Sequence, residues 1–195
     1  GATITAKCKE DGCYLADKLG GTFTISAPAA NTLTYDGNAK EATAKLDAAS
    51  GVTSLPTVGD ITYAQNGAAL SSAPVNAGEY TASITVGEGE NAATASVKYT
   101  IAQAELTIDS VTVASKTYNG SADAEITNVT FTGLKNSEAL TKGTDYEVSG
   151  TFNSANVNEA NKVTGTVTLK DTSKVKNYKL PITTYDVSAT IAQAA

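Results

Sequence analysis

Two cysteines, twenty acidic side chains and nine tyrosines are the residues of this sequence whose types could do chemistry, and histidine is absent. Cys8 and Cys13 enclose an Asp11-Gly12 step, which favours a tight reversal, so the two thiols could face each other across a hairpin and form a disulfide. Two free thiols are the alternative. A zinc site is the weaker interpretation, because two cysteines without histidine do not complete its four ligands.

Catalysis is the function class that the composition disfavours most. The absence of histidine removes the Ser-His-Asp triad, the Cys-His pair and histidine-ligated zinc together. A carboxylate pair of the glycosidase kind stays open by counting, but none of the acids lies in a recognisable motif. We therefore expect a protein that is not an enzyme and that uses no cofactor.

The segment 87–91, Gly-Glu-Gly-Glu-Asn, concentrates oxygen atoms that could bind calcium. Its two carboxylates lack the alternating Asp/Asn register of a dedicated calcium loop. A solvated hairpin tip is the better interpretation, and we expect no metal.

Exposed tyrosine rings could stack on the faces of sugars. The candidates are Tyr14, Tyr63, Tyr118 and Tyr146. Tyrosine is also the main bulky residue available for a core, because Trp and Met are absent and only three Phe occur. Burial is therefore the alternative for most of the nine.

The charge balance bears on partners. The formal net charge is −6 and every cation is lysine, so the chain repels phosphate backbones and nucleic acid is not an expected partner. No run approaches the roughly 20 apolar residues of a membrane-spanning helix. Gly1 in a chain without Met resembles the scar of a piece cut from a longer protein, whose export signal or anchor would lie elsewhere.

The elements that would position these residues are β-strands. Thr, Val, Ile and Tyr recur with a period of two, which is typical of half-buried strands and predicts an all-β protein. Two tandem antiparallel sandwiches of immunoglobulin-like character are expected, with β-grasp-like modules as the alternative. The divisions expected are a closing hairpin of a preceding repeat at 1–28, one module at 29–103 and a second at 104–195. Strands are expected near 2–6, 22–26, 61–63, 81–86, 96–102, 125–131, 146–152, 162–169 and 185–191, with one helical turn over 134–140.

Short motifs mark the modules. Tyr35-Asp36-Gly37 predicts a hairpin turn between two strand-like segments, and Tyr118-Asn119-Gly120 repeats it with Asn, which tight turns accept. Asn76-x-Gly78-x-Tyr80 has the form of a tyrosine corner, in which the hydroxyl bonds back to the upstream backbone. A sugar-stacking role for Tyr80 is the less favoured alternative.

The phrase Ile-Ala-Gln-Ala occurs at 101–104 and again at 191–194. Its recurrence after 90 residues, beside the 83 residues between Tyr35 and Tyr118, predicts two related modules. Each copy is expected to be the last strand of its module and to run directly into the next module, with Ile101 and Ile191 in the core, Gln103 and Gln193 at the module edge, and little freedom to swivel.

With these motifs, residues 33–104 resemble the MBG domains of large bacterial surface proteins. Residues 113–194 resemble the companion YDG domain through Tyr118-Asn119-Gly120, the run 163–169 and the closing 191–194. Two departures from the YDG pattern are Asn119 in place of Asp and, after an Asn-Val step, the segment 159–161 where Gly is usual.

The resemblance implies an exported, cell-surface array of β-modules that acts as a stalk or spacer and presents an adhesive domain. The alternative is an adhesin module that binds host glycan or host protein. If the chain binds neither, its expected partners are neighbouring repeats of the same chain. We expect a monomer. A Lys-to-Asn isopeptide bond between strands, as surface adhesins of this type carry, is a minor further hypothesis.

Overall fold

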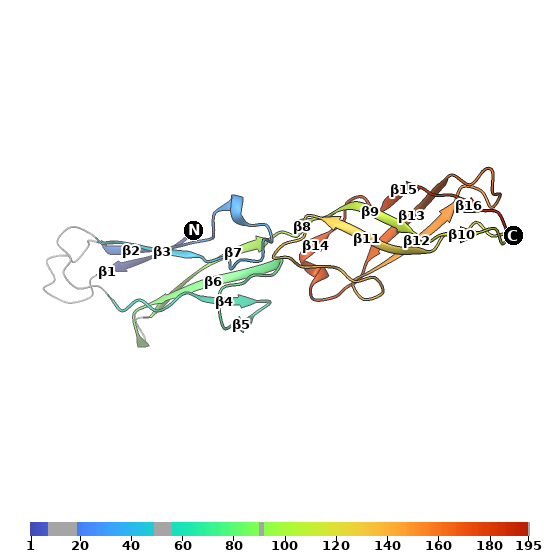
Figure 1. The fold of residues 1–195 in the computed structure, drawn as a ribbon. Coiled ribbons are helices and arrows are strands. Elements are labelled where there is room, and N and C mark those ends of the chain that lie inside the picture. Colours follow the sequence, from blue (N-terminus) through green and yellow to red (C-terminus); the bar gives the residue numbers. More distant parts are fainter. Residues whose placement is uncertain (8–18, 49–55, 90–91, 195) are drawn as a thin grey trace, which may run out of the picture. The chain divides into compact units, whose positions relative to one another are not determined.

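A computed structural model of the chain describes residues 1–7, 19–48, 56–89 and 92–194 (Figure 1). They form two compact units, Gly1–Ala102 and Gln103–Ala195. The expected cysteine pair, Cys8 and Cys13, lies outside the described residues, as do Tyr14 and part of the acidic segment 87–91.

The described residues are all-β. Helical segments such as η1 (Ala30–Thr32) and η3 (Val175–Asn177) are three-residue 3₁₀ turns, and no α-helix occurs in the described part of the chain. A β-grasp-like module needs a helix lying on its sheet, so each unit is a sandwich of antiparallel sheets.

Unit 1 packs a three-stranded sheet against a four-stranded one. The first has the order β1-β2-β3 and consists of β1 (Ala2–Lys7), β2 (Leu19–Ser26) and β3 (Thr43–Ala48). The second has the order β5-β4-β6-β7 and consists of β4 (Thr62–Gln65), β5 (Ala68–Leu70), β6 (Gly78–Val86) and β7 (Ala93–Ile101). Phe23 and Ile25 of β2 are buried between the sheets, as are Ala82 and Ile84 of β6.

The hairpin expected at 1–28 does not stand apart from the rest of unit 1. Its second strand, β2, pairs antiparallel with β3 from Gly21 opposite Ala48 to Ser26 opposite Thr43. The hairpin is therefore part of the sheet of unit 1. The division between the units falls after Ala102, one residue before the expected one.

Unit 2 has the same kind of two-layer core. One layer pairs β9 (Thr107–Val113) with β11 (Ile126–Thr132), and the other has the order β12-β13-β15 (Figure 1). The strands of the second layer are β12 (Tyr146–Phe152), β13 (Lys162–Leu169) and β15 (Thr184–Ser188). Val163 and Val167 of β13 are fully buried among Ile126, Val129 and Phe152.

Two short parallel pairs complete unit 2. At its start β8 (Ala104–Glu105) pairs with β14 (Tyr178–Lys179), and at its end β16 (Ile191–Ala192) pairs with β10 (Lys116–Thr117). Ile101 and Ile191 are buried and Gln103 and Gln193 are exposed, as the repeated phrase predicts.

Two expected local structures are wrong. The Asp36-Gly37 turn does not join two strands that pair with each other, because Thr34 on one side bridges in parallel to Ala102 while β3 on the other side pairs with β2. The helical turn expected at 134–140 is not formed, since Asn136 and Ser137 have φ of 49° and 58°, in the left-handed region.

The segment 159–161, which replaces the usual Gly of the YDG pattern, closes its corner through polar side chains. Glu159 Oε2 accepts a hydrogen bond from the Ser154 hydroxyl at 2.8 Å and from Asn156 Nδ2 at 3.1 Å. The hydrogen bond from Ser154 lowers the pKa of Glu159 most, and the bond from Asn156 lowers it further. Asn153 Oδ1 accepts the N–H groups of Asn161 and of the next residue, both at 3.0 Å.

Candidate functional site

The two Tyr-Asx-Gly motifs form the same turn in the two units. Asp36 Oδ1 accepts the backbone N–H two residues further on at 2.9 Å, and Asn119 Oδ1 accepts its counterpart at 3.1 Å. Gly37 and Gly120 then have φ of 79° and 81°, where a side chain would be strained. For the turn itself, either Asp or Asn supplies the one oxygen that is needed.

Each turn ties its tyrosine to the last strand of its own unit. Tyr35 N–H donates to the carbonyl of Ala102 at 2.8 Å in unit 1, and Tyr118 N–H donates to that of Ala192 at 2.8 Å in unit 2. The motif therefore holds the residue at which the chain leaves each sandwich.

The rings of these two tyrosines differ in exposure. Tyr35 is 4% exposed and belongs to the core, whereas Tyr118 is 45% exposed and lies next to Asn119. Of the tyrosines considered for sugar stacking, Tyr118 therefore has an accessible ring.

Tyr63 and Tyr146 occupy core positions. Tyr63 is 9% exposed and its hydroxyl accepts the N–H of Ala42 at 3.1 Å. Tyr146 is 1% exposed and its hydroxyl accepts the N–H of Val129 at 3.2 Å. Both rings are enclosed and both hydroxyls satisfy a buried backbone donor, so neither can present a face to a sugar.

The tyrosine corner has the bond expected from its motif. The Tyr80 hydroxyl donates to the carbonyl of Asn76 at 2.9 Å, and burial raises the pKa of Tyr80. Gly78 has φ of 153°, and a Cβ there would lie 2.7 Å from Gln65 Nε2. Tyr80 stands beside Tyr99, whose ring centroid is 6.1 Å away, so it packs as a core residue.

A buried lysine is a feature of unit 1 that the sequence analysis missed. Lys40 is 4% exposed, and its Nζ lies 2.7 Å from Asp36 Oδ2. The hydrogen bond from Lys40 and that from the backbone of Asn38 lower the pKa of Asp36. The Tyr99 hydroxyl donates to the carbonyl of Lys40 at 3.0 Å. The spacing of four residues between Asp36 and Lys40 was the available signal.

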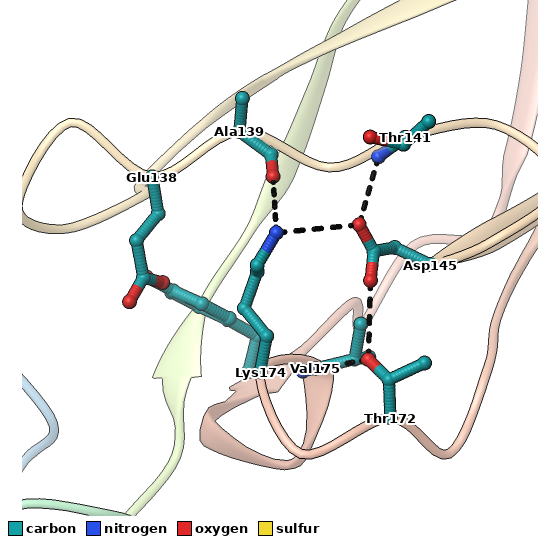
Figure 2. A network of polar contacts seen from close by, with 8 residues as sticks. Glu138, Ala139, Thr141, Asp145, Thr172, Lys174 and Val175 are labelled. Carbon is teal, nitrogen blue, oxygen red and sulfur yellow. Dashed lines mark hydrogen bonds and ion pairs between the residues drawn. The ribbon is translucent and has the colours of Figure 1, made fainter.

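A second polar cluster lies in unit 2 around a buried carboxylate, Asp145 (Figure 2). Its Oδ2 accepts the N–H of Thr141 at 2.9 Å and lies 3.5 Å from Lys174 Nζ, while its Oδ1 accepts the Thr172 hydroxyl at 3.1 Å. Lys174 Nζ also donates to the carbonyl of Ala139 at 2.9 Å. Burial by itself would raise the pKa of Asp145, but these partners outweigh burial and lower it.

The same cluster supports the segment that receives the start of unit 2. The Tyr178 hydroxyl donates to Glu138 Oε2 at 2.6 Å and accepts the N–H of Lys135 at 2.9 Å. Gln103 Nε2 donates to the carbonyls of Lys176 and Tyr178 at 3.0 and 2.9 Å. The polar network thus fastens residues 172–179, and these in turn bind the incoming chain.

Each unit has open grooves on its surface, among them the following two. The groove of unit 1 has a volume of about 470 Å³ and is lined by Asn66, Gly67, Glu79, Tyr80, Thr81, Lys98, Tyr99 and Thr100. The groove of unit 2 has a volume of about 440 Å³ and lies between β9 and β15. The second is the more apolar, since Ile182 at its side is 68% exposed.

The two polar clusters position backbone and side chains within their own units. Asp145 and Asp36 are held as acceptors by the donors described above. Within the described ranges, no three His, Cys, Asp or Glu side chains gather as metal ligands. In the same part of the chain, no helix is long and apolar enough to cross a membrane.

Residues 102–189 match the YDG domain family, which covers nearly the whole of unit 2. The comparisons with curated proteins and with solved structures gave no match.

Proposed function

We propose that this chain is a structural segment of a bacterial cell-surface protein, in which small β-modules in tandem space or present an adhesive domain. The observation that carries the proposal is the continuity of backbone pairing at residues 102 and 103. Ala102 N–H donates to Leu33 O at 2.9 Å in unit 1. The very next residue, Gln103, binds two carbonyls of unit 2 through its side chain, and Ala104 already belongs to β8.

A spacer needs modules that follow each other without a flexible linker, because a Gly/Ser-rich linker behaves as a random coil and does not hold the modules apart. Here both residues at the division are bonded within their own unit. We infer that the connection resists swivelling.

A shared plan of the two units also supports a modular array. In order along the chain, β2, β3, β4, β6 and β7 of unit 1 correspond in pairing to β9, β11, β12, β13 and β15 of unit 2. The buried hydroxyls correspond as well, since Tyr63 of β4 accepts the N–H of the residue just before β3 and Tyr146 of β12 accepts an N–H of β11. We infer that the units are two versions of one module, the first of MBG type.

Solution scattering tests the stiffness. We expect a narrow distribution of distances between the units, and a variant with Gly-Ser-Gly-Ser inserted between Ala102 and Gln103 provides the flexible reference. A native distribution as broad as that of the insertion variant would refute the spacer proposal.

The second candidate function is binding of a host glycan or protein, which the exposure of Tyr118 favours. Its ring is 45% exposed, and an exposed aromatic ring can stack on the face of a sugar. A screen of glycans and host proteins on the intact chain tests this function, with Tyr118→Ala as the variant. Saturable binding that the variant loses would replace the spacer proposal, and the absence of any binder would strengthen it.

A further inference from the structure

The groove of unit 2 runs between two strand edges. Within residues 103–194, β9 pairs with β11 on one side and with no strand on the other, and β15 likewise pairs with β13 alone. The lining consists of consecutive residues of both edges, 107–111 of β9 and 184–187 of β15, and of Ile182. Such an edge offers a row of backbone donors and acceptors to another strand.

In unit 1 the corresponding position is filled. Under the shared plan β9 corresponds to β2, and β2 carries an additional antiparallel partner on its other edge, β1. β1 also contacts β7, the strand that corresponds to β15. Unit 1 therefore contains a strand, β1, at the position that corresponds to the groove of unit 2.

The burial of the core strands reflects this difference. Phe23 and Ile25 of β2, beside β1, are 2% and 0% exposed. Ile108, Val111 and Val113 of β9 pack against the core of unit 2 but stay partly exposed. Covering the apolar surface between two strand edges with an extended segment removes it from water, which favours binding of that segment.

From this correspondence we propose that the groove between β9 and β15 is a docking site for an extended strand supplied by another polypeptide, which adds to β9 in antiparallel orientation as β1 adds to β2. This proposal rests on the shared plan of the two units and not on the spacer function.

The chemistry of the partner follows from β1 and from the lining. Ala2 and Ile4 of β1 are partly buried while Thr3 and Thr5 are exposed, so the partner alternates small or β-branched apolar residues with Thr or Ser. The lining carries two carboxylates and no cation. Asp186 is paired with Lys162 Nζ at 2.9 Å, whereas Asp109, within the described residues of unit 2, accepts the Thr130 hydroxyl at 3.2 Å and pairs with no lysine. A lysine in the partner strand would complement Asp109.

The probe is a synthetic peptide with the sequence of residues 1–7, Gly-Ala-Thr-Ile-Thr-Ala-Lys. It is titrated into the isotope-labelled whole chain, and amide chemical shifts and hydrogen exchange are recorded. We expect saturable shifts confined to β9 and β15 and slower exchange of β9 amides in the complex. A peptide with Ile4→Pro loses a ladder hydrogen bond and should not bind.

The variant Ile182→Glu places a charge at the side of the groove, at a residue too exposed to affect folding. It should weaken binding about tenfold, as expected when one aliphatic side chain no longer contributes buried area. Val58→Glu is the matched control, because Val58 is also an exposed aliphatic residue, at 43%, but lies in unit 1.

Three results would overturn the proposal: no saturable shift, shifts at β2 that mark exchange of the peptide for β1, or equal binding by the Ile182→Glu and Val58→Glu variants. A dimer of the free chain formed through the groove would also overturn it, because a second copy would then be the occupant. The scattering test of stiffness is independent of all four results.

Discussion

Replacing the buried carboxylate of unit 2, Asp145→Asn, should destabilise that unit selectively. The side chain of Asp145 is 6% exposed and accepts hydrogen bonds from Thr141 N–H and the Thr172 hydroxyl beside the charge of Lys174. Hydrogen bonds to a charged group contribute about 1.5–3 kcal/mol each. An amide keeps one acceptor oxygen but turns its NH₂ group toward a donor, so we expect a loss of about 2–3 kcal/mol in the free energy of unfolding.

The effect should depend on pH in a defined direction. The pKa of Asp145 is lowered in the folded protein from its ordinary value of 3.8, through the balance of burial against its hydrogen bonds and Lys174. A carboxyl with a depressed folded pKa contributes stability above its unfolded pKa, and that contribution is lost as the pH falls through the folded pKa. The difference in free energy of unfolding between the native chain and the variant should therefore be largest near neutral pH and shrink below about pH 4.

The assay is amide hydrogen exchange resolved by residue, because amides of unit 1 then serve as an internal reference. Asp171→Asn is the matched control. Asp171 also lies 3.5 Å from a lysine, Lys176, but its side chain is 82% exposed, and exposed pairs contribute about 0–1 kcal/mol. If both variants change protection in unit 2 equally, or if the difference between the native chain and Asp145→Asn does not shrink as the pH falls below about 4, the assignment of Asp145 as the fixed acceptor is refuted.

Three further predictions concern turns and strands. Gly165→Ala should cost more than about 3 kcal/mol, because a Cβ there would lie 1.8 Å from a carbonyl oxygen of the facing strand, and a melting temperature close to native would contradict this. Tyr80→Phe should cost about 1 kcal/mol through loss of the corner bond, while Tyr118→Phe should leave denaturant stability unchanged. Lys40→Met should change stability by less than about 1 kcal/mol, because the Asp36 side chain left without its partner is 45% exposed and can be solvated. In that variant an NMR titration should show the pKa of Asp36 rising toward its ordinary value, and an unmoved pKa would exclude the pair as its cause.

Local patterns predicted many of the strands. The strands expected at 146–152 and 162–169 coincide with β12 and β13, because their alternation of Val or Tyr with polar residues matches a half-buried sheet. β9 was not among the expected strands, although Thr107–Val113 alternates in the same way. The helical turn over 134–140 was mispredicted because its composition favours a helix while left-handed residues at 136 and 137 break the path.

The polar clusters could not be read from the sequence, since their members are far apart in it. Asp145 and Lys174 are 29 residues apart, and the backbone of Lys40 meets Tyr99 across 59 residues. A similarly large separation in sequence conceals the role of Gln103, whose hydrogen-bond partners lie 73 and 75 residues further on. Nothing in the local composition at these positions distinguishes them from solvated surface residues.

The sequence by itself determined the all-β class, the Asx turns, the tyrosine corner and the burial of Ile101 and Ile191, because each depends on a few neighbouring residues and on the two-residue period of a strand. Only the tertiary structure decided which edges are covered. The packing of β1 against β7, the parallel bridges that close each unit and the open groove beside β9 arise from long-range packing, in which an edge is filled or left free according to strands distant in the chain.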